Sequence, residues 1–206
     1  MGYAQAGFDV TGVDIDLQPN YPFPFVQADA LALDVTFLRS FDAIHASPMC
    51  QAHSPLNAYN KKVYPDQIAA TRAMLLAAGL PYVIENVVQA PLLSPIILCG
   101  SMFGLRVYRH RGFEASFPIT VLPHPPHLQR CARNGYLPDD RQFMTVSGGK
   151  HSEAWRVMAA DVMGVPWTRT IREVCESIPP AYTRHIGVQL LKHLTEMEDA
   201  GARQST

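Results

Sequence analysis

Short apolar runs that end at polar residues recur in the first half of the chain, and they are typical of buried strands. They cover residues 9–16, 25–31, 41–47 and 81–87. Between the last two runs, residues 66–78 have the pattern of a helix that Asp66 would cap and Gly79 would end. Strands that alternate with helices predict an α/β fold, in which a mostly parallel sheet is covered by helices on both faces.

The second half of the chain is less regular. Alternating residues predict a strand at 106–114, whereas residues 115–142 contain five prolines and no predicted regular structure. Helices are predicted further on, and two of them begin near Ser152 and Thr170, both of which are good N-caps. The last helix carries Ile186 and its apolar neighbours on one side.

Composition narrows the class of protein. A chain of 206 residues fits one domain, and its formal net charge of −1 provides no global basic field that would attract nucleic acid. The four cysteines lie far apart without a CxxC pair or a signal peptide, which predicts reduced thiols in a cytoplasmic protein. No apolar run reaches membrane-spanning length.

Polar side chains lie at the ends of the four predicted strands or just past them. They are Asp14, Asp29, Cys50 and Glu85. Parallel strands place their carboxyl ends at one edge of a sheet, where open α/β sheets bind ligands. We therefore expect these four residues to share one edge.

Each of the four residues has a functional and a structural interpretation. Cys50 is either a nucleophile or a small apolar filler. Asp14 could accept hydrogen bonds from ribose hydroxyls or could be a solvated loop acid, and Asp29 could bind an adenine amino group or cap the helix that follows it. Glu85 ends an apolar strand, so burial would raise its pKa and suit proton transfer, although backbone amides could equally satisfy a buried carboxylate.

Basic and metal-binding residues occur in the second half of the chain. Arg109 and Arg111 alternate on the predicted strand, so they would point to the same side and could grip an anion or a pyrimidine carbonyl, or could form a solvated face. His124, His127 and Cys131 are close in sequence, but a fourth zinc ligand would be the distant Cys175 or His151. Zinc sites usually show tighter paired spacing, so we expect no metal.

Three short motifs resemble those of the DNA cytosine-5 methyltransferases, in the same order. SPMCQ resembles the segment that carries the nucleophile, VIENV the segment that carries the acid, and VYRHR the arginine segment. GVDID and QADAL resemble the family's ribose-binding and adenine-binding segments, and WTRTIRE with SIPPAYTRHIG resembles its last two motifs. The resemblance covers residues 1–192 and is nearest to the small phage-type methylases.

The resemblance implies a Rossmann-like methyltransferase fold and a DNA methylase that uses S-adenosylmethionine. Its residues are assigned by motif: the catalytic ones would be Cys50, Glu85, Arg109 and Arg111, and the cofactor would contact Asp14, Ile15, Asp29, Ala30 and Pro48. The catalytic core would occupy residues 1–114, a reduced target-recognition region 115–165, and helices that complete the core 166–206. Cys50 would add to carbon 6 of cytosine, so that carbon 5 can accept a methyl group.

DNA is the partner that the resemblance implies. Candidate contacts are Gln51, Arg130, Arg133, Arg141 and Lys150. The same four basic residues could instead belong to a solvated surface loop. A cognate restriction nuclease could accompany the enzyme, which we expect to be a monomer without membrane contact.

Three departures from the family pattern leave other functions open. Met49 stands where a proline usually precedes the cysteine, Val107 occupies the usual glutamine position, and the glycine-rich first motif is absent. We therefore expect that the first, central strand is missing and that the chain is a truncated form of a longer reading frame, which would bind S-adenosylmethionine poorly. The alternatives are another enzyme that adds a one-carbon group to a pyrimidine, and a DNA-binding relative without activity.

Overall fold

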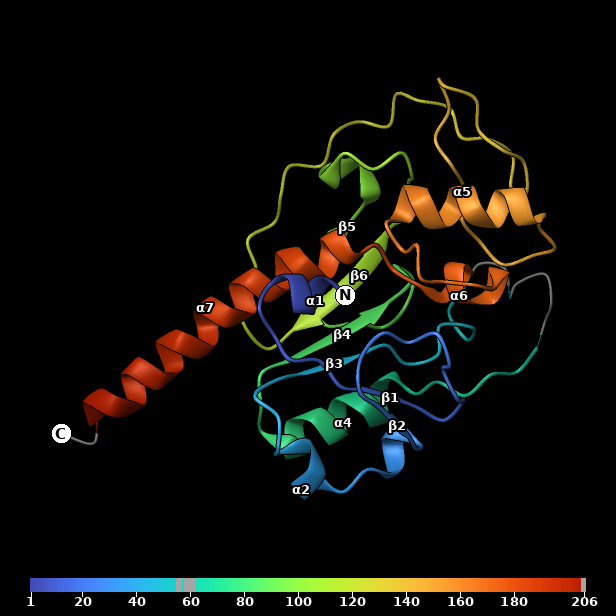
Figure 1. Ribbon diagram of the computed structural model, residues 1–206. Helices are drawn as coiled ribbons and strands as arrows, with labels where there is room; N and C mark the ends of the chain where they lie inside the picture. Colours follow the sequence, from blue (N-terminus) through green and yellow to red (C-terminus); the bar gives the residue numbers. More distant parts are fainter. Residues whose placement is uncertain (55–56, 58–61, 205–206) are drawn as a thin grey trace.

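Two separate β-sheets form the centre of the computed structural model, which describes residues 1–54, 57 and 62–204 (Figure 1). The smaller sheet pairs β1 (Gly12–Asp14) with β2 (Phe25–Gln27) in parallel. The larger sheet has the order β3-β4-β6-β5. Its strands are β3 (Ile44–Ala46), β4 (Tyr82–Asn86), β5 (Ile96–Leu98) and β6 (Arg111–Ala115).

The larger sheet is mixed rather than mostly parallel. β3 and β4 are parallel, as β1 and β2 are, but the two parallel pairs lie in separate sheets instead of in the single sheet that was expected. β6 is antiparallel to both of its neighbours, β4 and β5. The expected strand at 106–114 begins only at Arg111, because Val107 leaves the sheet to form an isolated bridge with Met144.

Helices cover both faces of the larger sheet, and most of them begin or end at the expected residues. Their bounds are α1 Gly2–Gln5, α2 Val35–Leu38, α4 Ile68–Ala78, α5 Glu153–Met163, α6 Ile171–Glu176 and α7 Pro180–Gln204. Two short 3-10 helices, η1 and η2, cover Ala30–Ala32 and Gly100–Phe103. The side chain of Ser152 caps α5, and Thr170 with Glu173 forms the predicted capping box of α6. Gly79 ends α4 with a left-handed φ of 73°, which glycine adopts without strain.

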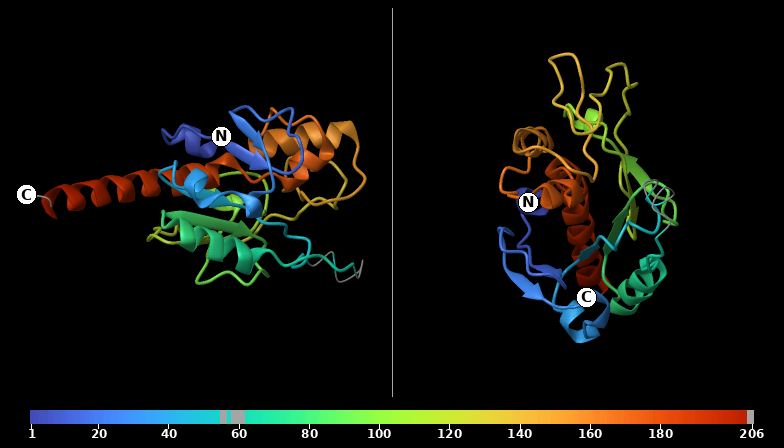
Figure 2. Two further views of the ribbon diagram at one scale, coloured as in Figure 1. Left: turned by 90° about the horizontal axis from the view of Figure 1, so that it is seen from below. Right: turned by 90° about the vertical axis from the view of Figure 1, so that its right-hand side faces the viewer.

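The main core lies between the sheet and α7. Phe113 and Val83 of the sheet are fully buried against Tyr182 and Ile186 of α7, and α1 packs against the same helix. On the opposite face, α4 buries Leu75 against β4. Figure 2 shows α7 running past this core and projecting from the body at its C-terminal end.

A second core forms around α5 from Trp155, Met163, Val107 and Met144, all fully buried. It supports the region between β6 and α6, where the chain has no strands apart from isolated bridges in the part that the structure describes. Among the described residues, no helix combines the length and the apolar character that crossing a membrane requires.

Candidate active site

Cys50 lies in the loop that leaves the carboxyl end of β3. Its side chain is half-buried and packs against the cluster of Ile68, Val87 and Ala90. The loop is tied to the neighbouring strand, because the buried Asn86 at the end of β4 donates a 2.9 Å hydrogen bond from Nδ2 to the carbonyl oxygen of Pro48. The thiol loop is therefore held against the end of β4, and residues 55–56 and 58–61, which follow it, lie outside the described residues.

Glu85 is buried beside this loop, with 8% of its surface exposed. Arg111, at the start of β6, places Nε 3.0 Å from the Glu85 carboxylate oxygen Oε1. Burial raises the pKa of Glu85, although the charges of Arg111 and Arg109 and a hydrogen bond from Ser47 act in the opposite direction. The strand end thus presents a carboxyl group that takes up a proton more readily than an exposed glutamate.

A hydrogen-bonded chain leads from α1 to the same carboxyl group. The hydroxyl of Tyr3 lies 2.8 Å from Nδ1 of His45, and Nε2 of that ring lies 3.1 Å from the Ser47 hydroxyl, which in turn bonds to Glu85. Burial lowers the pKa of His45 to about 4, so its ring is neutral at pH 7. The ring can therefore position Ser47 without adding positive charge.

Arg109 has different partners from Arg111. Its guanidinium donates to the carbonyl oxygens of Val146 (2.9 Å) and Cys175 (2.5 Å), and its own carbonyl accepts a 2.6 Å bond from the Tyr182 hydroxyl. Burial, followed by the charge of Arg111, lowers the pKa of Arg109 to about 9, which still leaves it charged at pH 7. Arg109 joins the segment before α5 and the last turn of α6 to the sheet, and it precedes β6 instead of alternating with Arg111 along it.

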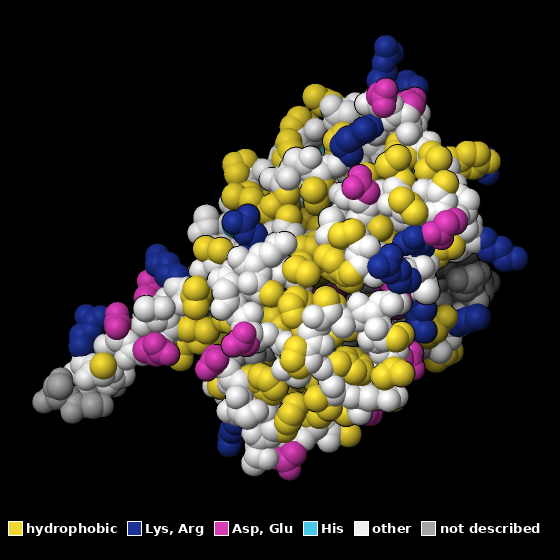
Figure 3. Space-filling view, viewed as in Figure 1, with side chains coloured by type: hydrophobic (Ala, Val, Ile, Leu, Met, Phe, Trp, Pro, Cys, Tyr) yellow, Lys and Arg dark blue, Asp and Glu magenta, His cyan; other side chains and the backbone are white. Residues whose placement is uncertain are grey.

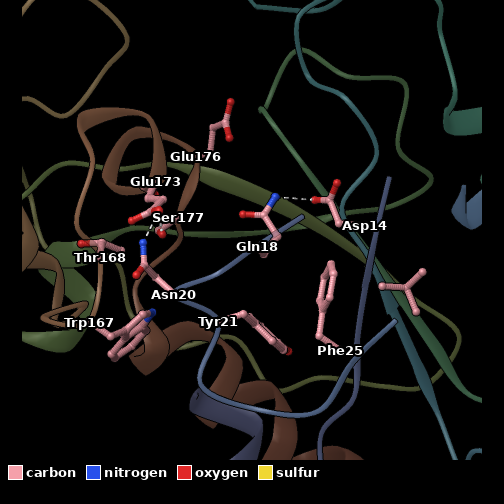
Figure 4. A pocket seen from close by; sticks show the side chains of 11 residues that line it. Asp14, Gln18, Asn20, Tyr21, Phe25, Trp167, Thr168, Glu173, Glu176 and Ser177 are labelled. Carbon is pink, nitrogen blue, oxygen red and sulfur yellow. Dashed lines mark hydrogen bonds between the residues drawn. The ribbon is translucent and has the colours of Figure 1, made fainter. Parts of the chain in front are cut away.

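Asp14 opens on a cavity of about 320 Å³ (Figure 4). The carboxylate accepts hydrogen bonds from the Asp16 amide (2.8 Å) and from Gln18 Nε2 (3.2 Å). The remaining walls come from the loop after β1 and from the α6 region: Asn20, Tyr21, Phe25, Trp167, Thr168, Glu173, Glu176 and Ser177. Aromatic walls with an acid at one side suit a ligand that has a flat ring and hydroxyl groups.

A second cavity, of about 350 Å³, separates the two sheets. Its walls include Ile44 and Ser47 on the β3 side and Val10 on the β1 side, and it shares Tyr21 and Trp167 with the first cavity. The two cavities therefore adjoin, and we call them together the inter-sheet cleft. The cleft leads from Asp14 to Ser47, the partner of Glu85.

The remaining predicted cofactor residues lie outside the walls of this cleft. Ile15 is 65% exposed, and Ala30 is exposed as the first residue of η1. Asp29 caps η1 by accepting a 3.0 Å bond from the Leu31 amide, which is the structural role considered for it, and Pro48 uses its carbonyl to hold Asn86. Their contacts with a cofactor stay a prediction.

The predicted DNA contacts lie on the surface. Arg130, Arg133, Arg141 and Lys150 are exposed, whereas Gln51 is half-buried next to Cys50. Figure 3 shows Lys and Arg side chains gathered on the side of the molecule that carries α6, with acidic side chains among them. These placements are compatible with both interpretations of the basic residues, phosphate contact and solvated loop.

Sequence reasoning missed four residues of the site: Tyr3, His45, Ser47 and Trp167. His45 was visible as a polar residue in an apolar run, and Ser47 as the residue before Pro48. Nothing in the local pattern linked either of them to Glu85, because that link depends on strand pairing.

Comparison with known proteins places the fold. No family model and no curated protein matches the chain. A solved structure, the crystal structure of the Spodoptera frugiperda DNMT2 E260A/E261A/K263A mutant, matches with a TM-score of 0.54 and 12% sequence identity. The match covers 94% of this chain and 95% of that one, so the chain has the fold of this protein along nearly its whole length.

Proposed function

We propose that the chain is a cytosine-5 methyltransferase that acts on DNA and uses S-adenosylmethionine. The main observation in support of the proposal is that three of the motifs meet at one place. Asn86 holds the Cys50 loop at the end of β4 by a hydrogen bond, and the adjacent Glu85 is paired with Arg111 of β6. The fold match to DNMT2, a cytosine-5 methyltransferase, supports the same reaction class.

The chemistry requires a thiol, an acid and a cation around one pyrimidine. Carbon 5 of cytosine is a weak nucleophile until the Cys50 thiolate adds to carbon 6. Glu85, with its raised pKa, would hold or protonate N3 and so favour that addition, while Arg111, which is paired with the Glu85 carboxylate, would bind the pyrimidine carbonyl. Removal of the carbon-5 proton and departure of the thiolate then restore the ring.

The inter-sheet cleft fits the cofactor. S-adenosylmethionine, when bound, supplies the methyl group that carbon 5 accepts. Asp14 would hold the ribose hydroxyls, and Tyr21, Phe25 and Trp167 would pack against the adenine and the apolar parts of the molecule. The cleft's extension to Ser47 supports placing the reacting end near Glu85.

A duplex substrate imposes one more condition. A paired base is not accessible inside the stack, so the target cytosine would have to rotate out of the helix to reach the half-buried Cys50. The exposed residues Arg130, Arg133, Arg141 and Lys150 would bind phosphates and position the strand.

Bisulfite sequencing of DNA from cells that express the chain tests the proposal and reports the target sequence. We expect protected cytosines in a fixed context with the wild type and none with Cys50→Ser. Equal protection with both chains would refute the role of Cys50, and an absence of protection with the wild type would refute DNA cytosine methylation.

We also propose that a further strand belongs between β1 and β3. Within the described residues each of these strands pairs on one side only, and the inter-sheet cleft lies between them. Unpaired edges inside a fold are costly. Calorimetry of the chain with and without an added segment that carries a strand and a glycine-rich loop tests this: tighter S-adenosylmethionine binding is expected with that segment, and equal affinity would contradict the proposal.

A further inference from the structure

We propose that Cys99, His110, His124 and His127 form a zinc site that fastens the proline-rich segment 116–130 to the edge of the larger sheet. One donor atom from each residue, the thiol sulfur or a ring nitrogen, lies within 4.8 Å of the other three. The site is separate from the proposed methyl-transfer reaction and uses none of its residues.

The spacing of the donor atoms fits tetrahedral zinc. Bonds of about 2.3 Å to sulfur and about 2.0–2.1 Å to nitrogen give tetrahedral edges of about 3.3 Å between nitrogens and about 3.5 Å between sulfur and nitrogen. Nε2 of His110 lies 3.3 Å from Nε2 of His124. Sγ of Cys99 lies 3.5 Å from Nε2 of His127. Two independent edges of the cluster therefore have the lengths that a shared zinc ion requires.

The donor set indicates the type of metal and its role. One thiolate with three imidazoles favours zinc over calcium or magnesium, which prefer oxygen ligands. Four protein ligands fill a tetrahedral shell, so no position is left for a substrate, and the site would be structural. The hydroxyl of Ser101 lies 3.3 Å from Cys99 Sγ and donates to it, which would stabilise the thiolate that zinc needs.

Ring stacking alone accounts for part of this arrangement. His110 and His124 are stacked, and Tyr108 stacks on His127 with 3.6 Å between ring centroids. Stacking brings ring faces together, but it does not require three ring nitrogens and a buried thiol to approach one another. A bound cation explains that convergence directly.

The position of the ligands explains what the metal would do. Cys99 follows β5 and His110 precedes β6, so both are anchored by the larger sheet. His124 and His127 lie in an exposed segment without regular secondary structure. Zinc would cross-link this segment to the sheet, and the binding free energy would then stabilise the fold. The segment is the first part of the predicted target-recognition region, residues 115–165, so the cross-link would also fix the position of that part of the region.

This ligand set differs from the one weighed in the sequence. His124 and His127 belong to both sets. Cys131 is exposed, and its backbone forms an isolated β-bridge with Phe143. Cys175 donates to the carbonyl of Ser147, and His151 stacks on Trp155. The true partners, Cys99 and His110, come from the sheet edge and are too distant in sequence for a spacing rule to select.

Metal analysis of the tag-free chain, purified from zinc-containing medium, tests the site. We expect about one zinc per chain, and, after exchange, the intense visible absorption of tetrahedral cobalt with a thiolate charge-transfer band. Cys99→Ser should abolish the charge-transfer band, and the double variant His124→Asn/His127→Asn, which alters only exposed ligands, should lose the metal. Cys131→Ser is the matched control and should keep the wild-type zinc content and spectrum.

Two outcomes would overturn the proposal. One is a folded wild-type chain that binds no zinc or cobalt when either is supplied in excess. The other is full zinc content in a double histidine variant whose circular dichroism matches the wild type. A chelator should lower the melting temperature of the wild type and of Cys131→Ser but not that of the double variant, and equal shifts in all three would also count against the site.

Discussion

The buried Glu85 forms an ion pair with the half-buried Arg111. Burial raises the pKa of Glu85, and Arg111 keeps the carboxyl group oriented. Glu85→Gln keeps the shape of the side chain but removes its proton-donating and charged forms. We expect methyl transfer to slow by about 10²–10⁴-fold, the range of general acid–base catalysis, measured as initial rates with labelled S-adenosylmethionine. A loss below about tenfold would assign Glu85 to a structural role.

Substitutions of Arg109 and Arg111, the two arginines of the VYRHR segment, should have different effects. Lysine cannot reproduce a planar guanidinium with several donors. Arg111→Lys should mainly reduce the rate of methyl transfer, with a smaller effect on the free energy of unfolding, because the partner of Arg111 is the Glu85 carboxylate. Arg109→Lys should instead lower stability, because its guanidinium holds the carbonyls of Val146 and Cys175. Urea unfolding and initial rates should be measured on both variants. A larger loss of stability in Arg111→Lys together with a larger loss of rate in Arg109→Lys would contradict the account.

At the residue scale, the sequence placed Cys50 just past β3 and Glu85 near the end of β4, because apolar runs that end abruptly mark strand ends. It could not separate Arg109 from Arg111. Their alternation assumed a strand from residue 106, whereas β6 begins at Arg111. The carbonyl partners of Arg109 come from residues 146 and 175, which a local pattern does not reveal.

At the element scale, α4 is fastened to the sheet by a bidentate ion pair. Arg72 of α4 donates from Nε and Nη2 to the two carboxylate oxygens of Glu114 in β6, each at 2.7 Å, and the Leu93 amide donates to the same carboxylate. Glu114→Gln leaves Arg72 without its counter-charge. We expect a loss on the order of 3 kcal/mol in the free energy of unfolding by urea at pH 7.

The matched control for Glu114 is the exposed pair of Lys192 and Glu196 on α7, 3.7 Å apart. Glu196→Gln should change the free energy of unfolding by less than about 1 kcal/mol, as exposed pairs do. Equal losses in the two variants would mean that burial does not decide the contribution of these pairs.

The same carboxyl group predicts a pH dependence. Burial alone would raise the pKa of Glu114, but the hydrogen bonds from Arg72 and Leu93 and the charge of Arg72 leave that pKa below its ordinary value of 4.5. Its stabilising contribution is therefore complete above pH 4.5 and is lost as the pH falls through the lowered pKa. Unfolding measured from pH 7 downward should show a smaller loss in Glu114→Gln than in the wild type, and parallel curves would contradict this assignment.

Elements with local signals were predictable. The Thr170–Glu173 capping box, the Ser152 cap and the Gly79 stop each depend on residues a few positions apart, and all three are present. The antiparallel pairing of β5 and β6 was not predicted, because β5 covers only the three residues Ile96–Leu98, for which the sequence predicted no strand.

At the scale of the whole molecule, function depends on surfaces that distant segments build together. Trp167 and Tyr21 are far apart in the sequence, yet both line the two cavities of the inter-sheet cleft. The order of the motifs predicted the fold class, but the division into two sheets follows from strand pairing, which the order of motifs does not specify.

The central claim is that Cys50 forms a covalent bond with a cytosine. Incubation of the whole chain with 5-fluorocytosine DNA and S-adenosylmethionine, followed by a denaturing gel, tests it most directly, because fluorine at carbon 5 blocks the step that releases the enzyme. We predict a denaturation-resistant adduct with the wild type and with Cys131→Ser, and none with Cys50→Ser, whose hydroxyl is far less ionised than a thiol. An adduct that persists in Cys50→Ser, or a wild type that forms none at saturating cofactor, would contradict the account.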